Sequence, residues 1–312
     1  YPNIMTVGEL SSTTIENGIA YSDPEKEELS MVFSFHHLKV DYLNGEKWSK
    51  TPFDFMELKE LLNDWQEGMS REDGWNALFL NNHDQPRAIS RFGDPVNHFE
   101  ASAKLLAQTI HLLRGTPYVF QGEEIGMTNP DFQEITDYVD IETHNAYKEL
   151  QEKDLPYEEI MEIIKSKSRD TSRTPMQWTN EKNAGFSTGT PWIQLAENYH
   201  EINVAKERKE GTIFNFYKKL IQLRKDMPII SEGNYRGIMM EHPSVYSYVR
   251  EYQGEQLLVL NHFYAETVTI EIPEEFLTRP SHYLIGNGKE RALTASLELG
   301  PYETIAFQLK AE

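Results

Sequence analysis

Two acidic side chains in this sequence follow apolar segments and could take part in acid–base chemistry. Glu9 follows the apolar segment Asn3–Gly8, and Asp84 follows a second apolar segment, Asn76–Asn81. Cleavage of a glycosidic bond needs a protonated carboxyl group near the leaving oxygen and a carboxylate near the positive charge that develops at the anomeric carbon. Each acid alone is a weak signal, because an acidic residue after a strand is more often a helix cap or a solvated turn. Both acids at one edge of a sheet would fit glycoside cleavage.

A group of basic side chains forms a second candidate site. His36, His37, Lys39 and Lys47 follow the apolar segment Met31–Phe35. The sequence has 30 Lys and Arg against 50 Asp and Glu, a formal net charge of −20, so a local excess of basic residues is informative. Lysine and histidine donate charge-assisted hydrogen bonds to phosphate oxygens. One alternative is that the lysines belong to a solvated, lysine-rich loop. A second alternative concerns the two histidines: adjacent residues on a strand point to opposite faces, so one of the two could be packed in the interior and not available to a ligand.

The alternation of short apolar runs with amphipathic stretches predicts the elements that position these residues. Such alternation indicates parallel βα units. The predicted strands are Asn3–Gly8, Met31–Phe35, Asn76–Asn81 and Pro117–Phe120, and the predicted helices are Phe53–Gln66, Phe99–Leu113 and Thr212–Arg224. Four units are half of a (β/α)8 TIM barrel, in which the active site lies at the carboxyl ends of the strands. The residues after each strand, including Gln121–Glu124 after the fourth, are therefore expected together at the end of the barrel where the strands terminate, here called the mouth.

Two regions depart from this alternation of strands and helices. An acidic insertion at about 126–203, with a helical pattern over Ala146–Lys165, is expected to lie on the ligand face. At 229–312 the apolar pattern has period two with frequent turns, which predicts an antiparallel β-sandwich domain. The strands predicted there are Ser244–Arg250, Gln256–Asn261, Thr267–Ile272 and Thr304–Gln308. The predicted fold is therefore α/β, with the C-terminal half of a catalytic barrel at 1–228 followed by a sandwich.

The composition argues against several kinds of partner. A net charge of −20 argues against nucleic acid, because a phosphate backbone requires a basic surface. No apolar run reaches the roughly 18 residues that span a membrane. There is no cysteine, so disulfides and thiolate metal sites are excluded. We expect no metal and no cofactor, and the absence of cysteine fits a cytoplasmic location.

Three segments resemble signature segments of the α-amylase superfamily (glycoside hydrolase family thirteen). Met5–Glu9 and Asn81–Arg87 resemble the segments at its fifth and seventh barrel strands, and Ser172–Trp178 is typical of its oligo-1,6-glucosidase branch. The resemblance covers essentially all 312 residues. It implies that the chain contains strands 5–8 of the barrel and belongs to a retaining α-glucosidase.

The resemblance also implies roles for individual residues. Glu9 would be the general acid/base and Asp84 the stabiliser of the transition state, while His83 and Arg173 would bind the glucose ring. Arg173 has an alternative role, which is to fix an acidic neighbour in the insertion. The family's nucleophile, an aspartate in a Gly-Phe-Arg-x-Asp segment after the fourth strand, does not occur, because the chain begins at the fifth strand. We therefore expect this chain alone to be inactive and to need the N-terminal half of the same enzyme to complete the barrel.

The basic group determines the expected substrate. The segments Gly8–Thr14 and Phe33–Asp41 are similar to those of family members that hydrolyse trehalose 6-phosphate, a small sugar phosphate. The four basic residues named above would then bind the phosphate, and the full-length enzyme would release glucose and glucose 6-phosphate with retention of configuration. A phosphorylated disaccharide also points to the cytoplasm. Two alternatives remain: an oligo-1,6-glucosidase or sucrose-active enzyme that acts on neutral substrates, and a non-catalytic, glycosidase-like binding subunit.

Overall fold

Four short parallel strands lie in the first 120 residues of the computed structural model, which describes residues 3–310. The strands are β1 (Val7–Leu10), β2 (Met31–Ser34), β3 (Ala77–Leu78) and β4 (Thr116–Pro117). β1 pairs with β2, β3 pairs with β4, and a parallel bridge between Val32 and Asn76 joins the two pairs. The strand order therefore follows the sequence, and the carboxyl ends of all four strands lie at one edge.

The observed strands lie at or beside the predicted ones but are shorter. β1 begins at Val7 rather than at Asn3, whose left-handed backbone (φ 64°) is incompatible with an extended strand. β4 ends at Pro117, and Tyr118 adds one more hydrogen bond to the carbonyl of Leu78 at 2.7 Å. So few hydrogen bonds between strands cannot hold the sheet together by themselves, and the packing of helices against the sheet supplies the remaining stability.

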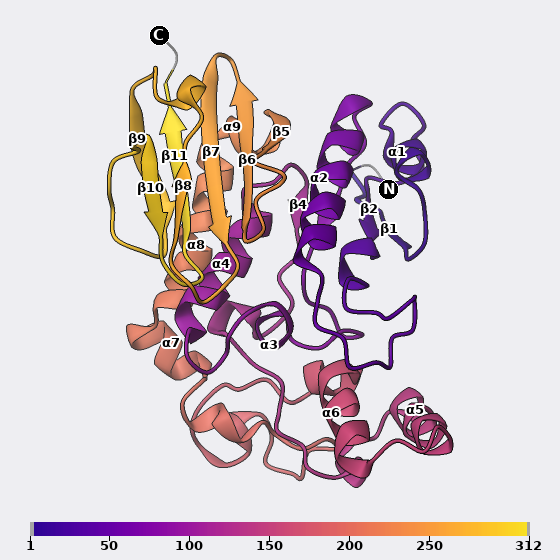
Figure 1. Ribbon diagram of the computed structural model, residues 1–312. Helices are drawn as coiled ribbons and strands as arrows, with labels where there is room; N and C mark the ends of the chain where they lie inside the picture. Colours follow the sequence, from indigo (N-terminus) through magenta and orange to yellow (C-terminus); the bar gives the residue numbers. More distant parts are fainter. Residues whose placement is uncertain (1–2, 311–312) are drawn as a thin grey trace.

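The helices that connect these strands are α1 (Ile15–Ser22), α2 (Phe55–Arg71), α3 (Ala88–Phe92) and α4 (Phe99–His111) (Figure 1). Three further helices precede the C-terminal sheet: α7 (Val204–Glu210), α8 (Thr212–Asp226) and α9 (Pro228–Ser231). In α2, the buried residues Leu58, Leu62, Trp65 and Met69 recur every three or four positions and so share one face. Val32 of β2 packs against this face. Within residues 3–310, no helix is both long enough and apolar enough to cross a membrane.

The insertion contains two helices instead of the single helical stretch predicted at Ala146–Lys165. α5 (Ile141–Glu152) and α6 (Tyr157–Lys167) pack together in a small apolar core. The helical path breaks between them because Asp154 has a left-handed backbone (φ 57°) and Pro156 directly precedes α6. Proline fits the start of a helix but not its interior. Figure 1 shows α5 and α6 at the end of the molecule opposite the C terminus.

The C-terminal region forms two antiparallel sheets. Its strands are β5 (Asn234–Ile238), β6 (Val245–Tyr252), β7 (Glu255–His262), β8 (Val268–Glu271), β9 (Ser281–Gly286), β10 (Ser296–Leu299) and β11 (Thr304–Leu309). Five strands pair in the order β5-β6-β7-β11-β9, and β10 pairs with β8. Side chains of both sheets, such as Leu258 and Leu297, share one apolar core. The four predicted strands correspond to β6, β7, β8 and β11, whereas β5, β9 and β10 were not predicted.

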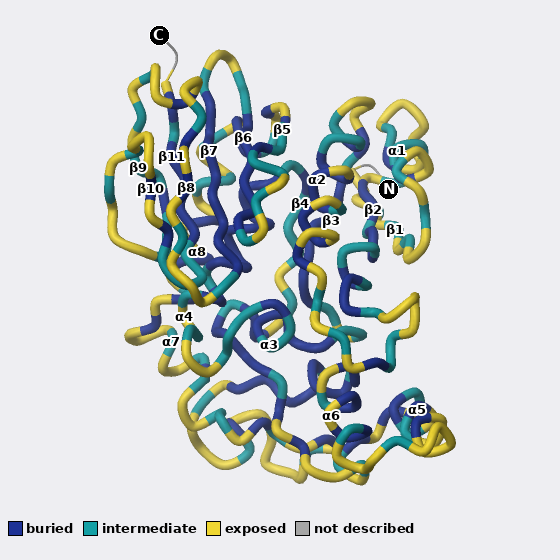
Figure 2. The backbone as a smooth tube through the Cα atoms, viewed as in Figure 1, coloured by how far each residue is buried: buried dark blue, intermediate teal, exposed yellow. Residues whose placement is uncertain are grey.

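The other face of the five-stranded sheet packs directly on the helices. Tyr248 and Val259 of this sheet belong to the same apolar cluster as Leu106 of α4 and Leu220 of α8. Figure 2 shows the buried backbone concentrated where this sheet meets the helices. The sheet and the helices therefore share one continuous core.

Two buried cations reinforce this joint by donating to main-chain carbonyls. The guanidinium of Arg250, in β6, donates to the carbonyls of Leu112 at 3.1 Å and Ile230 at 2.7 Å, beside the ends of α4 and α9. The ammonium of Lys59, in α2, donates to the carbonyl of His242 at 2.6 Å, in the turn before β6. Burial lowers the pKa of Lys59 to about 8. Each cation thus satisfies carbonyl groups that water cannot reach.

Replacing Arg250 with alanine should lower the free energy of unfolding by about 3 kcal/mol or more, because several buried carbonyls lose their donor. Urea-induced unfolding followed by circular dichroism measures the loss. Arg236→Ala is a matched control, because the half-exposed Arg236 pairs with Glu251 and Glu275 on the surface. Such pairs contribute about 0–1 kcal/mol. Equal losses in the two variants would contradict the role assigned to Arg250.

Candidate active site

The carboxyl ends of the four parallel strands surround a cavity of about 190 Å³. Ten residues line it: Glu9, Phe33, Phe35, Phe79, Asn81, Asn82, His83, Tyr118, Val119 and Phe120. Within residues 3–310, Glu9 is the one carboxylate in this lining. The ring of Phe33 packs edge-on against those of Phe79, at 4.9 Å, and Tyr118, at 4.7 Å. The cavity therefore combines an acid, a histidine and two amides with a rigid aromatic wall, a combination suited to a polar ligand with a hydrocarbon ring.

Strand register explains why Glu9 faces this cavity. Glu9 is paired with Phe33, which also lines the cavity, and the preceding residue Gly8 is paired with Val32. Val32 packs on the opposite face of the sheet, against α2. Since side chains alternate between the faces of a strand, the face that carries Phe33 also carries Glu9.

His83 and Asp84 lie together and are held by the insertion. Nη2 of Arg173 pairs with Oδ1 of Asp84 at 2.7 Å, and Nε of Arg173 donates to the carbonyl of His83 at 2.8 Å. Nε2 of His83 lies 3.4 Å from Oδ2 of Asp84. Arg173 thus contacts both predicted residues at once, which a lysine could not do with the same planar geometry.

Arg169 is a site residue that the sequence did not reveal. It lies in the short 3-10 turn η4 (Arg169–Ser172), and its guanidinium bridges Oδ1 of Asp84 at 3.2 Å and Oδ1 of Asp140 at 2.7 Å. Its Nε lies 3.5 Å from Glu142, which in turn pairs with Nζ of Lys47 at 2.8 Å. The hydrogen bond to Asp140 raises the pKa of Arg169 above its ordinary value. One feature of the sequence could have indicated Arg169: it lies four residues before Arg173, a spacing that places the two arginines about one helical turn apart.

Two of the four basic residues contact the loop that follows Glu9. Nζ of Lys39 donates to the carbonyl of Ser11 at 2.9 Å and lies 3.3 Å from Oγ of Ser12. Nε2 of His36 hydrogen-bonds with the carbonyl of Thr13 at 2.7 Å. The positive charge of Lys39 therefore lies beside the segment that begins directly after β1.

His37 faces another part of the molecule. Its Nε2 hydrogen-bonds with the carbonyl of Phe79 at 2.8 Å, and its ring lines a separate small cavity against Leu62 and Trp65 of α2. Burial lowers the pKa of His37 to about 4, so the ring is neutral at pH 7. The four basic residues thus have different polar partners. His36 and Lys39 contact the β1 loop, Lys47 contacts the insertion, and His37 contacts the carbonyl of Phe79. The ring of His36 also stacks on Trp65 of α2, with 5.6 Å between the ring centroids.

A buried charge cluster anchors the segment that carries these basic residues. Asp41, next along this segment, pairs with Arg91 of α3 at 2.5 Å and with Lys167 at the end of α6 at 2.8 Å. All three side chains are almost completely buried. The cluster therefore fixes the segment against both α3 and the insertion. Among residues 3–310, no group of three or more His, Asp or Glu side chains is arranged to hold a metal ion.

The chain belongs to the α-amylase family. The family profile of the α-amylase catalytic domain matches residues 1–233, and that of the α-amylase SusG C-terminal domain matches residues 245–306. The family predicted from the signature segments is therefore confirmed.

Within this family, the chain is similar to two groups of enzymes. It is 49% identical to trehalose-6-phosphate hydrolase of Bacillus subtilis over 98% of its length, and 45% identical to oligo-1,6-glucosidase of Bacillus cereus over 99%. The crystal structure of trehalose-6-phosphate hydrolase of Bacillus licheniformis superposes with a TM-score of 0.95, at 48% identity, over 98% of this chain and 56% of that one. The two curated relatives are likewise covered over 55% and 56% of their lengths, so the chain spans about half of each.

Replacing Asp41 with asparagine should lower the free energy of unfolding at pH 7 by about 3–5 kcal/mol, because Arg91 and Lys167 lose their buried counterion. Burial favours the neutral acid, but the hydrogen bonds from these two cations outweigh burial and lower the pKa of Asp41 below 3.8. A lowered pKa gives stability that is present above pH 3.8 and is lost as the pH falls through the folded-state value. The difference between wild type and variant should therefore shrink at lower pH.

Urea unfolding from about pH 3 to pH 7 tests both parts of this expectation. Asp131→Asn provides the control, because Asp131 is mostly exposed and pairs with Lys165 on the surface. A pH-independent difference for D41N would show that Asp41 acts through packing and not through its charge.

Proposed function

We propose that this chain is part of an α-glucosidase that hydrolyses trehalose 6-phosphate to glucose and glucose 6-phosphate. The main support is one arrangement: Glu9 and His83 line a common cavity, and Lys39 contacts Ser11, the first residue after β1 and two positions beyond Glu9. An acid beside a sugar-sized cavity fits glycoside cleavage, and a cation on the loop that follows this strand fits a phosphorylated substrate. The similarity to trehalose-6-phosphate hydrolases supports the same substrate. A sugar phosphate is a cytoplasmic substrate, so we place the enzyme in the cytoplasm.

The proposed architecture assigns β1–β4 to strands 5–8 of a (β/α)8 barrel at 1–228. The insertion at about 126–203 would cover the ligand face, and 229–312 would form a β-sandwich domain. Sequential parallel pairing and a cavity at the carboxyl strand ends support this assignment. The matched relatives are about twice as long as the region they share with this chain. This supports the proposal that an N-terminal half is needed to complete the barrel.

In the proposed mechanism, Glu9 in its acid form protonates the bridging oxygen while a carboxylate nucleophile attacks the anomeric carbon. Glu9 then removes a proton from water, which releases glucose with retained configuration. Retaining enzymes place the two carboxyl groups about 5–5.5 Å apart. Glu9 is the one carboxylate among the described lining residues, so the proposed nucleophile lies outside this lining. We expect the chain alone to be inactive, because the segment that carries the nucleophile in this family does not occur in the sequence.

Asp84 would stabilise the transition state, with His83 and Arg173 beside it on the glucose ring. Both arginines of the insertion pair with Oδ1 of Asp84. Oδ2, whose contact within residues 3–310 is His83 at 3.4 Å, would accept the sugar hydroxyls. The arginines would then fix the direction of the carboxylate without occupying the oxygen that meets the substrate.

The phosphate would be bound by His36, Lys39 and Lys47. An ammonium group has three donors. Lys39 directs two of them at Ser11 and Ser12, and Lys47 directs one at Glu142, so donors remain on both for a phosphate oxygen. His37 is left out of this proposed group because its ring is buried and neutral and its Nε2 is engaged with the carbonyl of Phe79.

One observation favours a neutral substrate as the second candidate. Glu142 already balances the charge of Lys47 at 2.8 Å, which weakens the attraction of this side of the site for an anion. The 45% identity to oligo-1,6-glucosidase fits the same alternative. Isomaltose would then replace trehalose 6-phosphate as the preferred substrate.

In the full-length enzyme, Lys39→Ala should lower kcat/KM for trehalose 6-phosphate by about tenfold to a hundredfold, because a hydrogen bond to a charged group contributes about 1.5–3 kcal/mol. The value for a neutral aryl α-glucoside should change little. Lys50→Ala is the control in the same loop, because Lys50 is exposed and pairs with Glu162. A wild-type preference for isomaltose over trehalose 6-phosphate would reject the phosphate site.

Glu9→Gln should lower kcat for trehalose 6-phosphate by at least about a hundredfold, because the amide cannot transfer the proton. Steady-state turnover of the full-length variant measures the change, and circular dichroism verifies that it is folded. Undiminished hydrolysis would remove Glu9 from the mechanism. Absence of turnover in the wild type as well would favour a non-catalytic binding subunit.

A further inference from the structure

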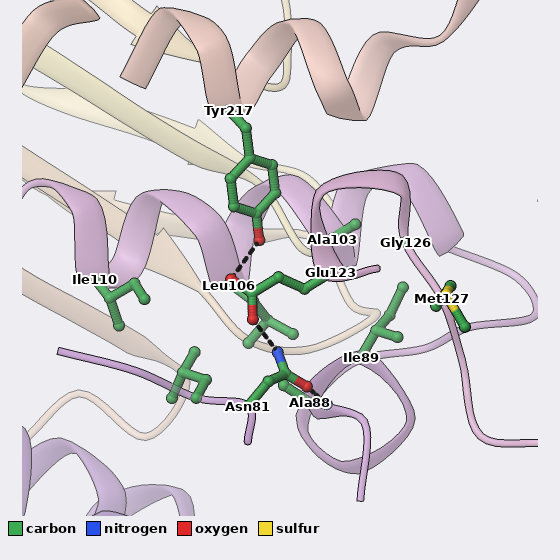
Figure 3. A pocket seen from close by; sticks show the side chains of 11 residues that line it. Asn81, Ala88, Ile89, Ala103, Leu106, Ile110, Glu123, Gly126, Met127 and Tyr217 are labelled. Carbon is green, nitrogen blue, oxygen red and sulfur yellow. Dashed lines mark hydrogen bonds between the residues drawn. The ribbon is translucent and has the colours of Figure 1, made fainter. Parts of the chain in front are cut away.

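A buried carboxylic acid, Glu123, contacts the start of the segment that carries His83 and Asp84. Glu123 is in the short 3-10 turn η2 (Glu123–Ile125) after β4, and only 8% of its surface is exposed. Figure 3 shows its side chain among apolar residues of α3 and α4, around a cavity of about 20 Å³. Although Glu123 follows a strand end, its side chain therefore points into the interior and not into the cavity lined by Glu9.

Two glycines with left-handed backbones fix this inward direction. Gly122 has φ 94° and Gly126 has φ 75°, a conformation that other residues adopt only under strain. A Cβ on Gly122 would lie 2.3 Å from Sδ of Met127, and one on Gly126 would lie 2.6 Å from the ring of Phe99. Neither position has room for a side chain, so the turn holds Glu123 in one place.

Glu123 is linked by hydrogen bonds to the start of α3. Nδ2 of Asn81 donates to Oε2 of Glu123 at 2.6 Å, and Oδ1 of Asn81 accepts from the backbone N–H of Ala88 at 2.7 Å. The hydroxyl of Tyr217, in α8, lies 3.3 Å from Oε1 of Glu123 (Figure 3). Asn81 thus spans the base of the loop 82–86, and Glu123 fixes the orientation of Asn81.

The other end of this loop is also held by a buried side chain. The guanidinium of Arg87 donates to the carbonyl of Gln121 at 2.6 Å and to that of Ser172 at 3.1 Å, directly before Arg173. Its backbone N–H donates to Asn129 at 2.8 Å. The loop is therefore fixed at both ends, and the end at Asn81 depends on a carboxyl group.

We propose that Glu123 is a positioning residue of the active site, which holds the loop 82–86 through Asn81 and so directs His83 and Asp84 toward the substrate. This inference rests on the proposed glycosidase function. Glu123 acts as a neutral acid: Oε2 accepts from Nδ2 of Asn81, and Oε1 accepts from the hydroxyl of Tyr217. Ionisation of Glu123 would place a charge in an apolar pocket, draw the side chain toward water and release Asn81.

The charged and titratable groups that face Glu123 come from three elements. Arg87 faces it from the segment after β3, Glu124 from the same turn and Tyr217 from α8, while α4 contributes apolar side chains. Burial raises the pKa of Glu123 to about 8, the hydrogen bond from Asn81 opposes this rise, and the charge of Glu124 adds to it. Glu123 is therefore neutral at pH 7 and ionised in more alkaline solution.

The test compares the pH profiles of the full-length wild type and Glu123→Gln with 4-nitrophenyl α-glucoside. This leaving group needs little protonation, so the measured rate depends least on proton donation by Glu9. We expect kcat/KM of the wild type to fall above about pH 8, near the pKa of Glu123. E123Q should remain active at pH 7 and lose this fall, because glutamine keeps an acceptor for Asn81 and never becomes charged. Glu123→Ala should lower kcat by about tenfold or more, because the loop is misplaced.

Glu124→Gln is the matched control and should keep the alkaline fall, moved to lower pH because the charge of Glu124 no longer raises the pKa of Glu123. Among the described residues, Glu124 bonds only to the backbone N–H of Gly122, at 2.7 Å. The same fall in E123Q, a flat wild-type profile, or an unchanged kcat in E123A would overturn the positioning role. If E123A does not fold, the E123Q profile decides. A wild type that hydrolyses no α-glucoside would overturn the proposed function and this inference with it.

Discussion

Parallel pairing of β1–β4 is the constraint on which the site depends. It brings the ends of four strands, far apart in sequence, to the edge of one cavity. The strands have only two to four residues each, so their ladder contributes few hydrogen bonds. Their arrangement is maintained from outside, by α2 against β2 and by the C-terminal sheet against α4 and α8. The geometry at the mouth is thus a property of the whole packed core.

Electrostatics at the site differ from those of the chain as a whole. The chain carries a net charge of −20, yet three carboxylates beside the strand ends are each matched by at least one cation. Asp84 faces Arg173, Asp41 faces Arg91 and Lys167, and Glu142 faces Lys47. Most of these cations reach across from a different element. The ion pairs therefore hold the insertion on the strand ends as well as balancing the local charge.

The sequence predicted features that depend on local pattern. Apolar runs located the four parallel strands, and the helical period located α2, α4 and α8. The pattern placed β5, β9 and β10 in no strand, because they are short, mix polar with apolar residues and gain burial only from partners distant in sequence. The break between α5 and α6 was missed, although Pro156 marked it.

Within the site too, residues marked by local sequence pattern were predicted, and residues that depend on contacts with distant elements were not. Glu9, His83 and Asp84 were predicted from their place after strands and from signature segments, and Arg173 from its segment alone; their roles stay predictions. Arg169 was not predicted, because its importance comes from three acids on other elements. The direction of Glu123 depends on two glycines in the left-handed region, and sequence pattern does not give backbone angles.

The shared core has a consequence for how members of this family diverge. Lys59, in α2, donates to a carbonyl between β5 and β6, and Arg250, in β6, donates to carbonyls at the ends of α4 and α9. Donor and acceptor lie on opposite sides of the joint in each case. A C-terminal sheet exchanged between two relatives would keep these bonds only if it supplied an arginine at the position of Arg250 and placed its main-chain carbonyl within reach of Lys59. The two regions are therefore expected to be inherited as a unit.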